Sequence, residues 1–576
     1  MPADDAGEVL LASMKLNGID RIWFTSGSEM GFVQEGSVKA RELGRPAPRV
    51  MTITHEAVAL AAACGETVVT GKPSAAAFHV ECGMLNAGGM YHVADRGRYP
   101  VLVTSGYPSS AEANSVPGAR SSFIQYYQQI RDQGELIRQY MRWDHKLAPY
   151  DNPGTVISRA VQVMLSDPRG PAYLAIPRES SMAPIASGQT RFPLTDQLRP
   201  VSAPPPDAAL LREAAAWLLA SNNPLIVAGR VGTSHEALAP LVELAETLGA
   251  RVMSDAHRLS FPGSHPLHRG VAGVTPLTGQ PDCILSLDQL TPWIPGRFDP
   301  GPDVRLIRIG LDPAERWVPI YEFPSDLSIV GDAVAAIPLL VDEIRRQRTP
   351  EQRRACEARL EKAQEEGRQR LARLVATAES DRARGVIHAL WLSHQIGQTL
   401  DPETLVVQET VETALFNRTL PGTQVASGGS NLGWAAPASV GMKVAAPDRQ
   451  VVSVTGDGAW MFSNPQVTTW ASAFHKAPVL FIIFNNRGYR TGTTDVERAY
   501  PEGYVARTGD FTGGLFDPCP NYSGEASASG AYGEKVTEPD QVGPAIRRGL
   551  AANREGAPAV LDVWLPKIGP GLPTAR

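Results

Sequence analysis

The sequence predicts an α/β protein made of three open, doubly wound parallel-sheet domains. At 576 residues the chain is too long for a single hydrophobic core. Short apolar runs that are typical of buried strands alternate with segments of helical periodicity, and such alternation indicates parallel sheets covered by helices on both faces. A proline-rich stretch and a highly charged stretch divide this alternation into three blocks.

The first block, residues 1–184, is the predicted N-terminal domain. Residues 7–18 have helical spacing and stop at a glycine, and residues 21–25 form a short apolar run that predicts a buried strand. The alternation then continues with a strand over 49–52, an alanine-rich helix over 56–70, and strands over 75–80 and 99–105.

Two connecting segments set off the central and C-terminal domains. Residues 185–206 are rich in proline and polar residues, which predicts a linker. The central block, 207–345, carries a predicted strand and glycine turn over 224–229. Residues 346–375 have mixed charges at helical spacing and predict a solvated connector helix. The third block, 376–576, again alternates strands and helices and contains the glycine-rich motifs.

Composition and charge narrow the function classes and the cellular location. A net charge of −6 gives no electrostatic footprint for nucleic acid or anionic lipid. The five cysteines lie far apart without a C-x-x-C pair, which argues against a disulfide framework or zinc site and fits a reducing cytosol. The chain shows neither a signal-peptide pattern nor a run of about 18–20 apolar residues. We therefore expect a cytoplasmic protein with no nucleic-acid or membrane partner.

A glycine-rich strand end is the strongest indication of a ligand-binding site in this sequence. Residues 451–458 form a β-branched strand that ends in Gly456, Asp457 and Gly458. Ligands of open α/β sheets bind at the carboxyl ends of strands, where glycine lets the backbone approach a phosphate. The helical stretch from Ala459 onward would direct N–H groups at such an anion, and Asp457 offers the carboxylate oxygen that Mg²⁺ prefers. Both glycines and Ala459 are therefore cofactor-binding candidates.

A second predicted strand over 478–484 delivers Asn485 and Asn486 to the same sheet edge. This G-D-G…N-N arrangement resembles that of the thiamine-diphosphate enzyme family, which includes pyruvate decarboxylase, benzoylformate decarboxylase and acetolactate synthase. The resemblance implies that Asp457 and Asn486 bind Mg²⁺ through their side chains and Gly488 through its carbonyl oxygen. The Asp457-to-Asn486 spacing of 29 residues is longer than in close relatives and leaves open which asparagine binds the metal.

Two upstream segments extend the resemblance. Residues 426–437 are similar to a family segment in which a bulky apolar residue wedges the cofactor into a bent conformation, and Leu432 has that position. An ordinary core role for Leu432 is the alternative. Residues 408–413 are similar to a loop whose backbone helps to hold the diphosphate, with Thr410 as the cofactor-binding candidate.

The glutamate that activates the cofactor is assigned to Glu56. A carboxyl group that hydrogen-bonds N1′ of the aminopyrimidine turns the 4′-nitrogen into a base for the thiazolium C2 proton. In the family this glutamate follows the second strand of the first domain, often as His-Glu before an alanine-rich helix, and His55-Glu56 has that context. The family's glutamate and diphosphate site come from different subunits, which implies at least a homodimer, with homotetramers common.

The substrate side resembles benzoylformate decarboxylase only in part. His79, Gly83 and Asn86 keep that enzyme's H-x₃-G-x₂-N spacing, and Ser28 resembles its substrate-binding serine. His79 and Ser28 are therefore catalytic candidates and Asn86 a cofactor-binding candidate, with a structural role for His79 as the alternative. The loop 288–293 lacks the second histidine of that enzyme, and the His-His pair of pyruvate decarboxylase is not found. The sequence therefore does not identify the substrate.

The central domain and one long loop carry weaker signals. The turn 310–313 recurs in the family's central domain, which binds FAD in acetolactate synthase and ADP in oxalyl-CoA decarboxylase; nothing in this sequence supports either nucleotide. The stretch 488–533, rich in glycine, proline and tyrosine, predicts an active-site lid. Arg490, Asp495 and Glu497 are candidates for substrate contact in it, with a solvated surface as the alternative.

Together these features predict a thiamine-diphosphate- and Mg²⁺-dependent lyase or carboligase. The leading expectation is non-oxidative decarboxylation of a 2-oxo acid, or ligation of the resulting enamine to an aldehyde. A 2-hydroxyacyl-CoA or oxalyl-CoA lyase and an acetolactate-synthase-like ligase are alternatives, and a catalytically silent homologue is a remote one. A Rossmann dehydrogenase is disfavoured because no G-x-G-x-x-G follows an early strand.

Overall fold

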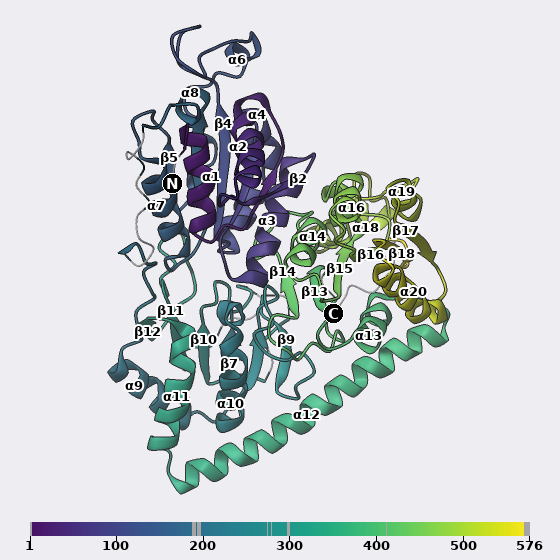
Figure 1. Ribbon diagram of the computed structural model, residues 1–576. Coiled ribbons are helices and arrows are strands. Elements are labelled where there is room, and N and C mark those ends of the chain that lie inside the picture. Colours follow the sequence, from purple (N-terminus) through teal and green to yellow (C-terminus); the bar gives the residue numbers. More distant parts are fainter. Residues whose placement is uncertain are drawn as a thin grey trace.

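The computed structural model describes residues 3–568 apart from 187–189, 191, 193–196, 274, 278, 297–299 and 411, so part of the predicted linker lies outside the described residues. The chain forms three six-stranded parallel sheets with helices packed around them (Figure 1). The predicted fold class, three α/β domains with open parallel sheets, is confirmed.

The first sheet has the order β2-β1-β3-β4-β6-β5. Its strands are β1 (Arg21–Phe24), β2 (Arg49–Thr52), β3 (Ser74–Phe78), β4 (Val101–Tyr107), β5 (Trp143–Lys146) and β6 (Ala172–Pro177). The helices are α1 (Ala6–Leu16), α2 (Gly31–Glu42), α3 (Glu56–Thr70), α4 (Glu81–Ala87), α5 (Met90–Arg96), α6 (Ile124–Tyr127), α7 (Pro153–Leu165) and α8 (Arg178–Ser181). Every residue of β3 is buried, because helices cover both faces of the sheet there.

The second sheet has the order β12-β11-β10-β7-β8-β9. Its strands are β7 (Pro224–Ala228), β8 (Arg251–Ser254), β9 (His268–Val271), β10 (Cys283–Leu287), β11 (Arg305–Gly310) and β12 (Leu327–Val330). The helices are α9 (Ala208–Ala220), α10 (Leu238–Leu248) and α11 (Ala333–Gln347). Sequence positions 224–229, expected to form a strand and turn, are β7 and the residue after it.

A single long helix, α12 (Pro350–Ala383), joins the second and third domains along the outside of the molecule (Figure 1). Thr349 and Gln352 form a reciprocal capping box at its start, which satisfies two backbone donors of the first turn. The helix is 34 residues long and continues beyond the 346–375 segment expected from charge periodicity. Most of its residues are exposed or half-buried, in keeping with that mixed charge.

The third sheet has the order β14-β13-β15-β16-β18-β17. Its strands are β13 (Leu405–Glu409), β14 (Gln424–Ala426), β15 (Val451–Gly456), β16 (Leu480–Asn485), β17 (Tyr532–Val536) and β18 (Ala559–Trp564). The helices are α13 (Ala389–Thr399), α14 (Ala435–Ala445), α15 (Asp457–Phe462), α16 (Pro465–Phe474), α17 (Arg490–Ala499), α18 (Tyr504–Thr508), α19 (Tyr522–Ala528) and α20 (Val542–Arg554). Neighbouring strands β15 and β16 therefore end at the same edge.

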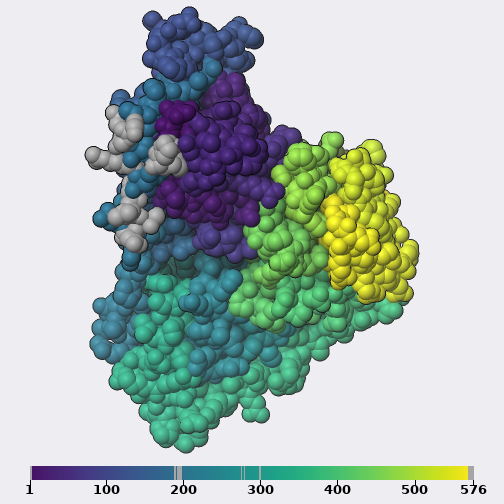
Figure 2. All heavy atoms as spheres, in the orientation of Figure 1, coloured from purple at the N-terminus to yellow at the C-terminus, as the bar shows by residue number. Residues whose placement is uncertain are grey.

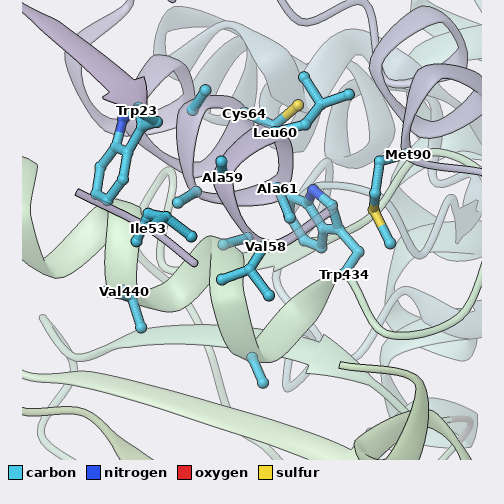
Figure 3. Packing of buried hydrophobic residues seen from close by; sticks show 14 of the residues in the cluster. Trp23, Ile53, Val58, Ala59, Leu60, Ala61, Cys64, Met90, Trp434 and Val440 are labelled. Atoms are coloured by element: carbon cyan, nitrogen blue, oxygen red, sulfur yellow. The ribbon is translucent and has the colours of Figure 1, made fainter. Parts of the chain in front are cut away.

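The first and third domains meet directly through α3 and α14. One buried apolar cluster contains residues of both domains, among them Trp23, Val58, Trp434 and Val440 (Figure 3). In the space-filling view the purple first domain and the green third domain touch along their shared side (Figure 2). Within the described chain, no helix has the length and apolar character needed to cross a bilayer.

Candidate active site

Asp457 is held at the edge of the third sheet, where β15 ends and α15 begins. Its Oδ1 accepts the N–H of Gly458 at 2.9 Å, and its Oδ2 accepts the N–H of Gly488 at 3.0 Å. Burial raises the pKa of this carboxyl group to about 6, while the backbone N–H groups oppose the shift. Asp457 and Gly488, which the family resemblance assigned to one metal, thus lie side by side although 31 residues separate them.

The two neighbouring asparagines have different surroundings. Asn485 is fully buried, and its Nδ2 donates to Asp562 Oδ1 at 2.7 Å while its Oδ1 accepts the N–H of Arg487 at 3.1 Å. The Oδ1 atom of Asn486 is buried and accepts no hydrogen bond from the described residues. An amide oxygen without a donor is suited to a hard cation. Asn486, and not Asn485, is therefore the asparagine with a ligand atom to offer.

The donor set around Asp457 fits Mg²⁺. It combines a carboxylate, the open amide oxygen of Asn486 and the carbonyl oxygen of Gly488, and Mg²⁺ prefers such oxygen ligands. The Gly488 carbonyl accepts one N–H, that of Arg490 at 3.1 Å, and keeps a second lone pair. Beside these groups, a Cβ on Gly456 would meet no atom within 4 Å, so the backbone there is open to a ligand.

Glu409 holds the loop around Leu432 through hydrogen bonds to the loop backbone. The Oε1 of Glu409 accepts the N–H of Gly433 at 2.7 Å, and its Oε2 accepts the N–H of Ala435 at 3.0 Å. Burial raises the pKa of Glu409 to about 7, against the effect of these N–H groups. Leu432 itself is 39% exposed, which is unusual for a leucine with a core role. Thr410 follows Glu409 directly and is half-buried.

Glu56 is the first residue of α3 and is buried. Its Oε2 accepts a hydrogen bond from Asn86 Nδ2 at 3.2 Å, so these two predicted residues lie together. A Cβ on Gly83 would lie 2.9 Å from Glu56 Oε1, so the glycine leaves room for this carboxyl group. His55 caps the helix, because its Nδ1 accepts the N–H of Ala57 at 3.3 Å.

Ser28 and His79 converge on a buried carboxylate, Glu29, that sequence reasoning missed. Ser28 Oγ donates to Glu29 Oε2 at 2.7 Å, and His79 Nδ1 lies 3.0 Å from the same oxygen. The imidazole N–H is not aligned with this oxygen for a hydrogen bond. Gln125 Nε2 donates to the other oxygen at 3.1 Å, and Gln128 Nε2 lies 3.1 Å from His79 Nε2. The Glu29 side chain has no exposed surface.

The loop 288–293 joins the central domain to the first domain, whereas the predicted lid belongs to the third domain. Asp288 forms a two-pronged ion pair with Arg98 of the first domain at 2.9 and 3.2 Å, and Trp293 is buried in the central domain. At the base of the predicted lid, residues 487–489 pair with 514–516 in antiparallel fashion. Within the lid, Asp495 pairs with Arg498 at 2.6 Å.

The candidate residues thus fall on two domains. The candidate metal ligands, the candidate diphosphate glycines, Thr410 and Leu432 lie on the third domain, whereas Glu56, Asn86, Ser28 and His79 lie on the first. Of the groups that sequence reasoning missed, Glu29 had one signal, its place directly after Ser28. Glu409 had another, because it is an acidic residue at a strand end.

Comparisons with known proteins agree with this division. Family models of thiamine pyrophosphate enzymes match in three parts: the N-terminal TPP-binding domain over residues 4–136, the central domain over 211–340 and the C-terminal TPP-binding domain over 408–563. Benzoylformate decarboxylase from Pseudomonas aeruginosa is 28% identical over 452 residues, which cover 76% of this chain and 78% of that protein. A probable acetolactate synthase from Mycobacterium bovis is 26% identical over 582 residues, covering 97% and 95%.

Solved structures show the same fold. The thiamine diphosphate-dependent 4-hydroxybenzoylformate decarboxylase of Rhodococcus jostii superposes with a TM-score of 0.76 at 23% identity, covering 98% of this chain and 99% of that one. Benzoylformate decarboxylase from Polynucleobacter necessarius gives 0.74 at 21% identity, covering 99% and 100%. With three successive domain matches and the Asp457–Asn486 site at the expected sheet edge, this chain belongs to the thiamine pyrophosphate enzyme family.

Proposed function

We propose that this enzyme cleaves the bond next to the carbonyl of a 2-oxo acid with loss of CO₂, and that it can join the remaining fragment to an aldehyde. The main observation that supports this proposal is the Ser28–Glu29–His79 cluster, which lies on the same domain as the Glu56–Asn86 pair. The likeness to benzoylformate decarboxylase over three quarters of both chains supports this choice.

Each cofactor-binding residue has a defined task. Asp457, Asn486 and Gly488 would hold Mg²⁺, and the backbone from the open Gly456 through Gly458 to Ala459, together with Thr410, would face the diphosphate. Leu432 would press on the cofactor from its exposed position, and Glu56 would hydrogen-bond the pyrimidine ring. When bound, thiamine diphosphate supplies the electron sink for the pair of electrons released from the broken bond.

His79 is the proposed proton donor and acceptor. The carboxylate of Glu29 lies 3.0 Å from Nδ1, on one side of the ring, and Nε2 on the other side would exchange a proton with the substrate. Gln128 occupies the Nε2 side at 3.1 Å and can present either its NH₂ group or its oxygen, so it tolerates both protonation states. Ser28, whose hydroxyl is bonded to Glu29, would bind the polar end of the substrate.

A homodimer is proposed as the minimum active unit. The groups that face the pyrimidine and those that face the diphosphate lie on different domains. Large apolar side chains close to both sets are exposed in the single chain, including Leu85 beside Asn86, Leu432, and Met461 and Phe462 in α15. A second copy that covers these side chains would remove them from water, and a homotetramer would arise from two such dimers.

An acetolactate-synthase-like ligase is the second candidate. The match to a probable acetolactate synthase extends over 97% of this chain, further than the match to benzoylformate decarboxylase. The two candidates differ in the second step, because a ligase requires a second carbonyl substrate. Product analysis with one 2-oxo acid, with and without added aldehyde or second 2-oxo acid, separates them. A yellow flavin in the purified protein would also favour the ligase.

The test is turnover with thiamine diphosphate and Mg²⁺ on a panel of aromatic and aliphatic 2-oxo acids, aldehydes and 2-hydroxyacyl-CoAs. We expect CO₂ release from at least one 2-oxo acid, and a loss of about 100-fold or more in Glu56→Gln. Glu29→Gln should lower kcat about tenfold or more with little change in cofactor affinity, because Glu29 acts through His79. Exclusive turnover of acyl-CoA substrates, or unchanged rates in Glu56→Gln, would refute the proposal.

A further inference from the structure

The loop that carries Leu432 is contacted by all three domains. It begins after β14, the edge strand of the third sheet, and ends where α14 starts. On its own domain it is held by Glu409. The other two domains reach it through side chains that neither the cofactor assignment nor the substrate site uses: Arg258 of the central domain, and Tyr99 and His92 of the first domain, where His92 Nε2 accepts the Ser430 N–H at 3.1 Å.

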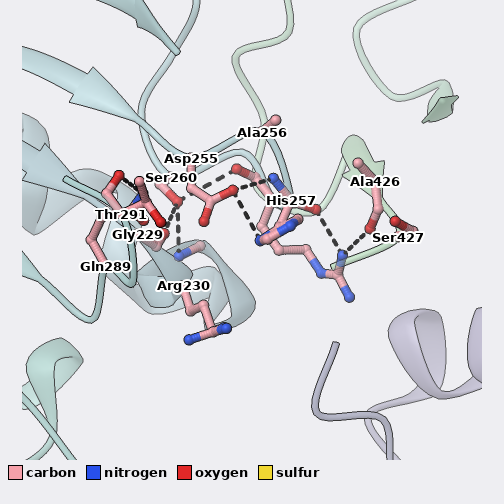
Figure 4. Close-up of polar contacts among 12 residues, drawn as sticks. Gly229, Arg230, Asp255, Ala256, His257, Ser260, Gln289, Thr291, Ala426 and Ser427 are labelled. Atoms are coloured by element: carbon pink, nitrogen blue, oxygen red, sulfur yellow. Dashed lines mark hydrogen bonds and ion pairs between the residues drawn. The ribbon is translucent and has the colours of Figure 1, made fainter. Parts of the chain in front are cut away.

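The central domain extends the edge of the third sheet. After β8, a turn brings residues 256–259 alongside β14, where Ala426 N–H donates to His257 O at 2.8 Å and Leu259 N–H donates to Gln424 O at 3.1 Å. Figure 4 shows Asp255 and His257 on this turn, facing Ala426 and Ser427. The Asp255 carboxylate accepts the His257 N–H at 2.7 Å and lies 3.0 Å from its ring, which fixes the turn.

Arg258 is the side chain that crosses this junction. It is buried, and its guanidinium donates to Ala426 O at 2.9 Å and to His257 O at 2.7 Å. The same guanidinium lies 5.3 Å from the centre of the Tyr99 ring, within the range of a cation–π contact. Because a buried arginine needs hydrogen-bond acceptors, moving the Ala426 carbonyl away would cost this charge one of its two carbonyl partners.

Tyr99 contacts both ends of the loop. Its hydroxyl donates to Ser427 O at 2.9 Å at the start of the loop, and its ring stacks on Trp434 at the end, with 5.8 Å between ring centres and 16° between planes. A Cβ on Gly97 would lie 2.1 Å from the Tyr99 ring, and a Cβ on Gly428 would lie 2.6 Å from the Gly97 Cα. Two glycines thus permit the close approach of the first domain to the loop.

We propose that Tyr99 and Arg258 are positioning residues that together hold the loop 427–434 in the form that receives the cofactor. The inference rests on the proposed role of Leu432. The ring and hydroxyl of Tyr99 fix the two ends of the loop, and Arg258 fixes both the entering strand and the Tyr99 ring. The position of Leu432 is thereby set by three domains, and the central domain influences cofactor binding without touching the cofactor.

The first test needs no turnover. Hydrogen–deuterium exchange of the full-length, cofactor-free protein is compared for wild type, Tyr99→Phe and Arg258→Met, with Tyr173→Phe and Arg269→Met as matched controls. Tyr173 is a buried tyrosine whose hydroxyl is bonded to Ser105 within the first domain, and Arg269 is a buried arginine that donates to the carbonyls of Pro266 and of Ala363 in α12. Both test variants should speed exchange in peptides covering 427–435, and the controls should not. Equal protection in test variants and wild type would overturn the proposal.

The second test measures cofactor affinity. Thiamine diphosphate is titrated at saturating Mg²⁺ with circular dichroism as the signal. Loss of one hydrogen bond or one charged contact to the loop should weaken binding about fivefold in each test variant. The double variant should lose less than the product of the two single losses, because both side chains act on one loop. Losses that multiply would mean that the two residues act independently, and the proposal of joint positioning would fail.

Leu432→Ala separates this inference from the proposed function. If Leu432→Ala binds the cofactor as wild type does while Tyr99→Phe and Arg258→Met still weaken binding, the wedge role fails and the holding of the loop stands. If Leu432→Ala weakens binding and the two test variants do not, the wedge role stands and the positioning role fails. Arg258→Lys, which keeps the charge, should recover part of the protection lost in Arg258→Met.

Discussion

A methyl group added at the crossing of α3 and α14 should force the first and third domains apart. At this crossing each helix has a glycine facing the backbone of the other helix, which lets the two backbones come into contact. A Cβ on Gly441 would lie 1.9 Å from the Ala62 carbonyl oxygen, and a Cβ on Gly65 would lie 2.0 Å from that of Ala438. Both obstacles are backbone atoms in helices, so no side chain can rotate away. In Gly441→Ala the helices themselves must move.

The cost follows from these distances. The closest ordinary carbon–oxygen contacts are about 3.3 Å, so the helices must separate by about 1.4 Å at the crossing. Overpacking of this kind costs about 3 kcal/mol at the upper end of the usual range, whereas alanine in place of glycine within a helix gains about 1 kcal/mol. The expected net loss is about 2 kcal/mol. It falls on the apolar cluster that the two domains share.

Thermal unfolding followed by circular dichroism tests this value. Gly441→Ala should lower the midpoint by about 4 °C or more. Gly31→Ala is the matched control, because a Cβ there meets no atom within 4 Å, and its midpoint should not fall. The Gly65→Ala, Gly441→Ala double variant should lose less than the sum of the single losses, because one separation of the helices relieves both contacts. A midpoint at or above wild type in Gly441→Ala would refute the reasoning.

Three further outcomes are expected. Burial raises the pKa of Glu409 to about 7, so its contribution to stability is present below about 4.5 and is lost as pH rises through about 7. In the wild type, this loss lowers the free energy of unfolding by at most about 3 kcal/mol. Thermal midpoints measured from pH 5 to 8 should not show the loss in Glu409→Gln, and a fall in the midpoint as steep as in wild type would contradict the assignment. Asn486→Ala should weaken Mg²⁺ binding about tenfold or more in a titration, whereas Asn485→Ala should mainly lower the thermal midpoint because it removes a donor from buried Asp562; reversed effects would mean that Asn485 is the ligand. Dialysis against EDTA should lower the midpoint, since cofactor and metal at about 100 times Kd stabilise by about 2.7 kcal/mol, and an unchanged midpoint would argue against binding.

The elements with strong local patterns were predictable from sequence. The β-branched run before Gly456 and the apolar run before Asn485 became neighbouring strands β15 and β16, and the alanine-rich segment became α3. Parallel strands that end at one sheet edge bring the residues after them together, so the meeting of Asp457 with Gly488 followed from the pattern. Glycine and aspartate at a strand end are local signals, and no distant contact is needed to interpret them.

The partners of those residues were decided by tertiary structure alone. Sequence spacing left two asparagines as metal ligands, and only the buried Asp562, 77 positions after Asn485, shows which amide is already engaged. In the same way, Glu29 meets His79, and Tyr99 meets Ser427 across 328 positions. Such contacts depend on how sheets and helices pack, which periodicity does not encode.

The sequence by itself determined the fold class, the family and the strand ends that carry the proposed metal and diphosphate residues. Tertiary structure decided the arrangement of the loop around Leu432, because the side chains that hold it come from three domains. Glu409, Tyr99 and Arg258 follow no shared motif. Local patterns specify where a chain turns and which face is buried, whereas a side chain that braces a distant loop is specified only once the domains have packed.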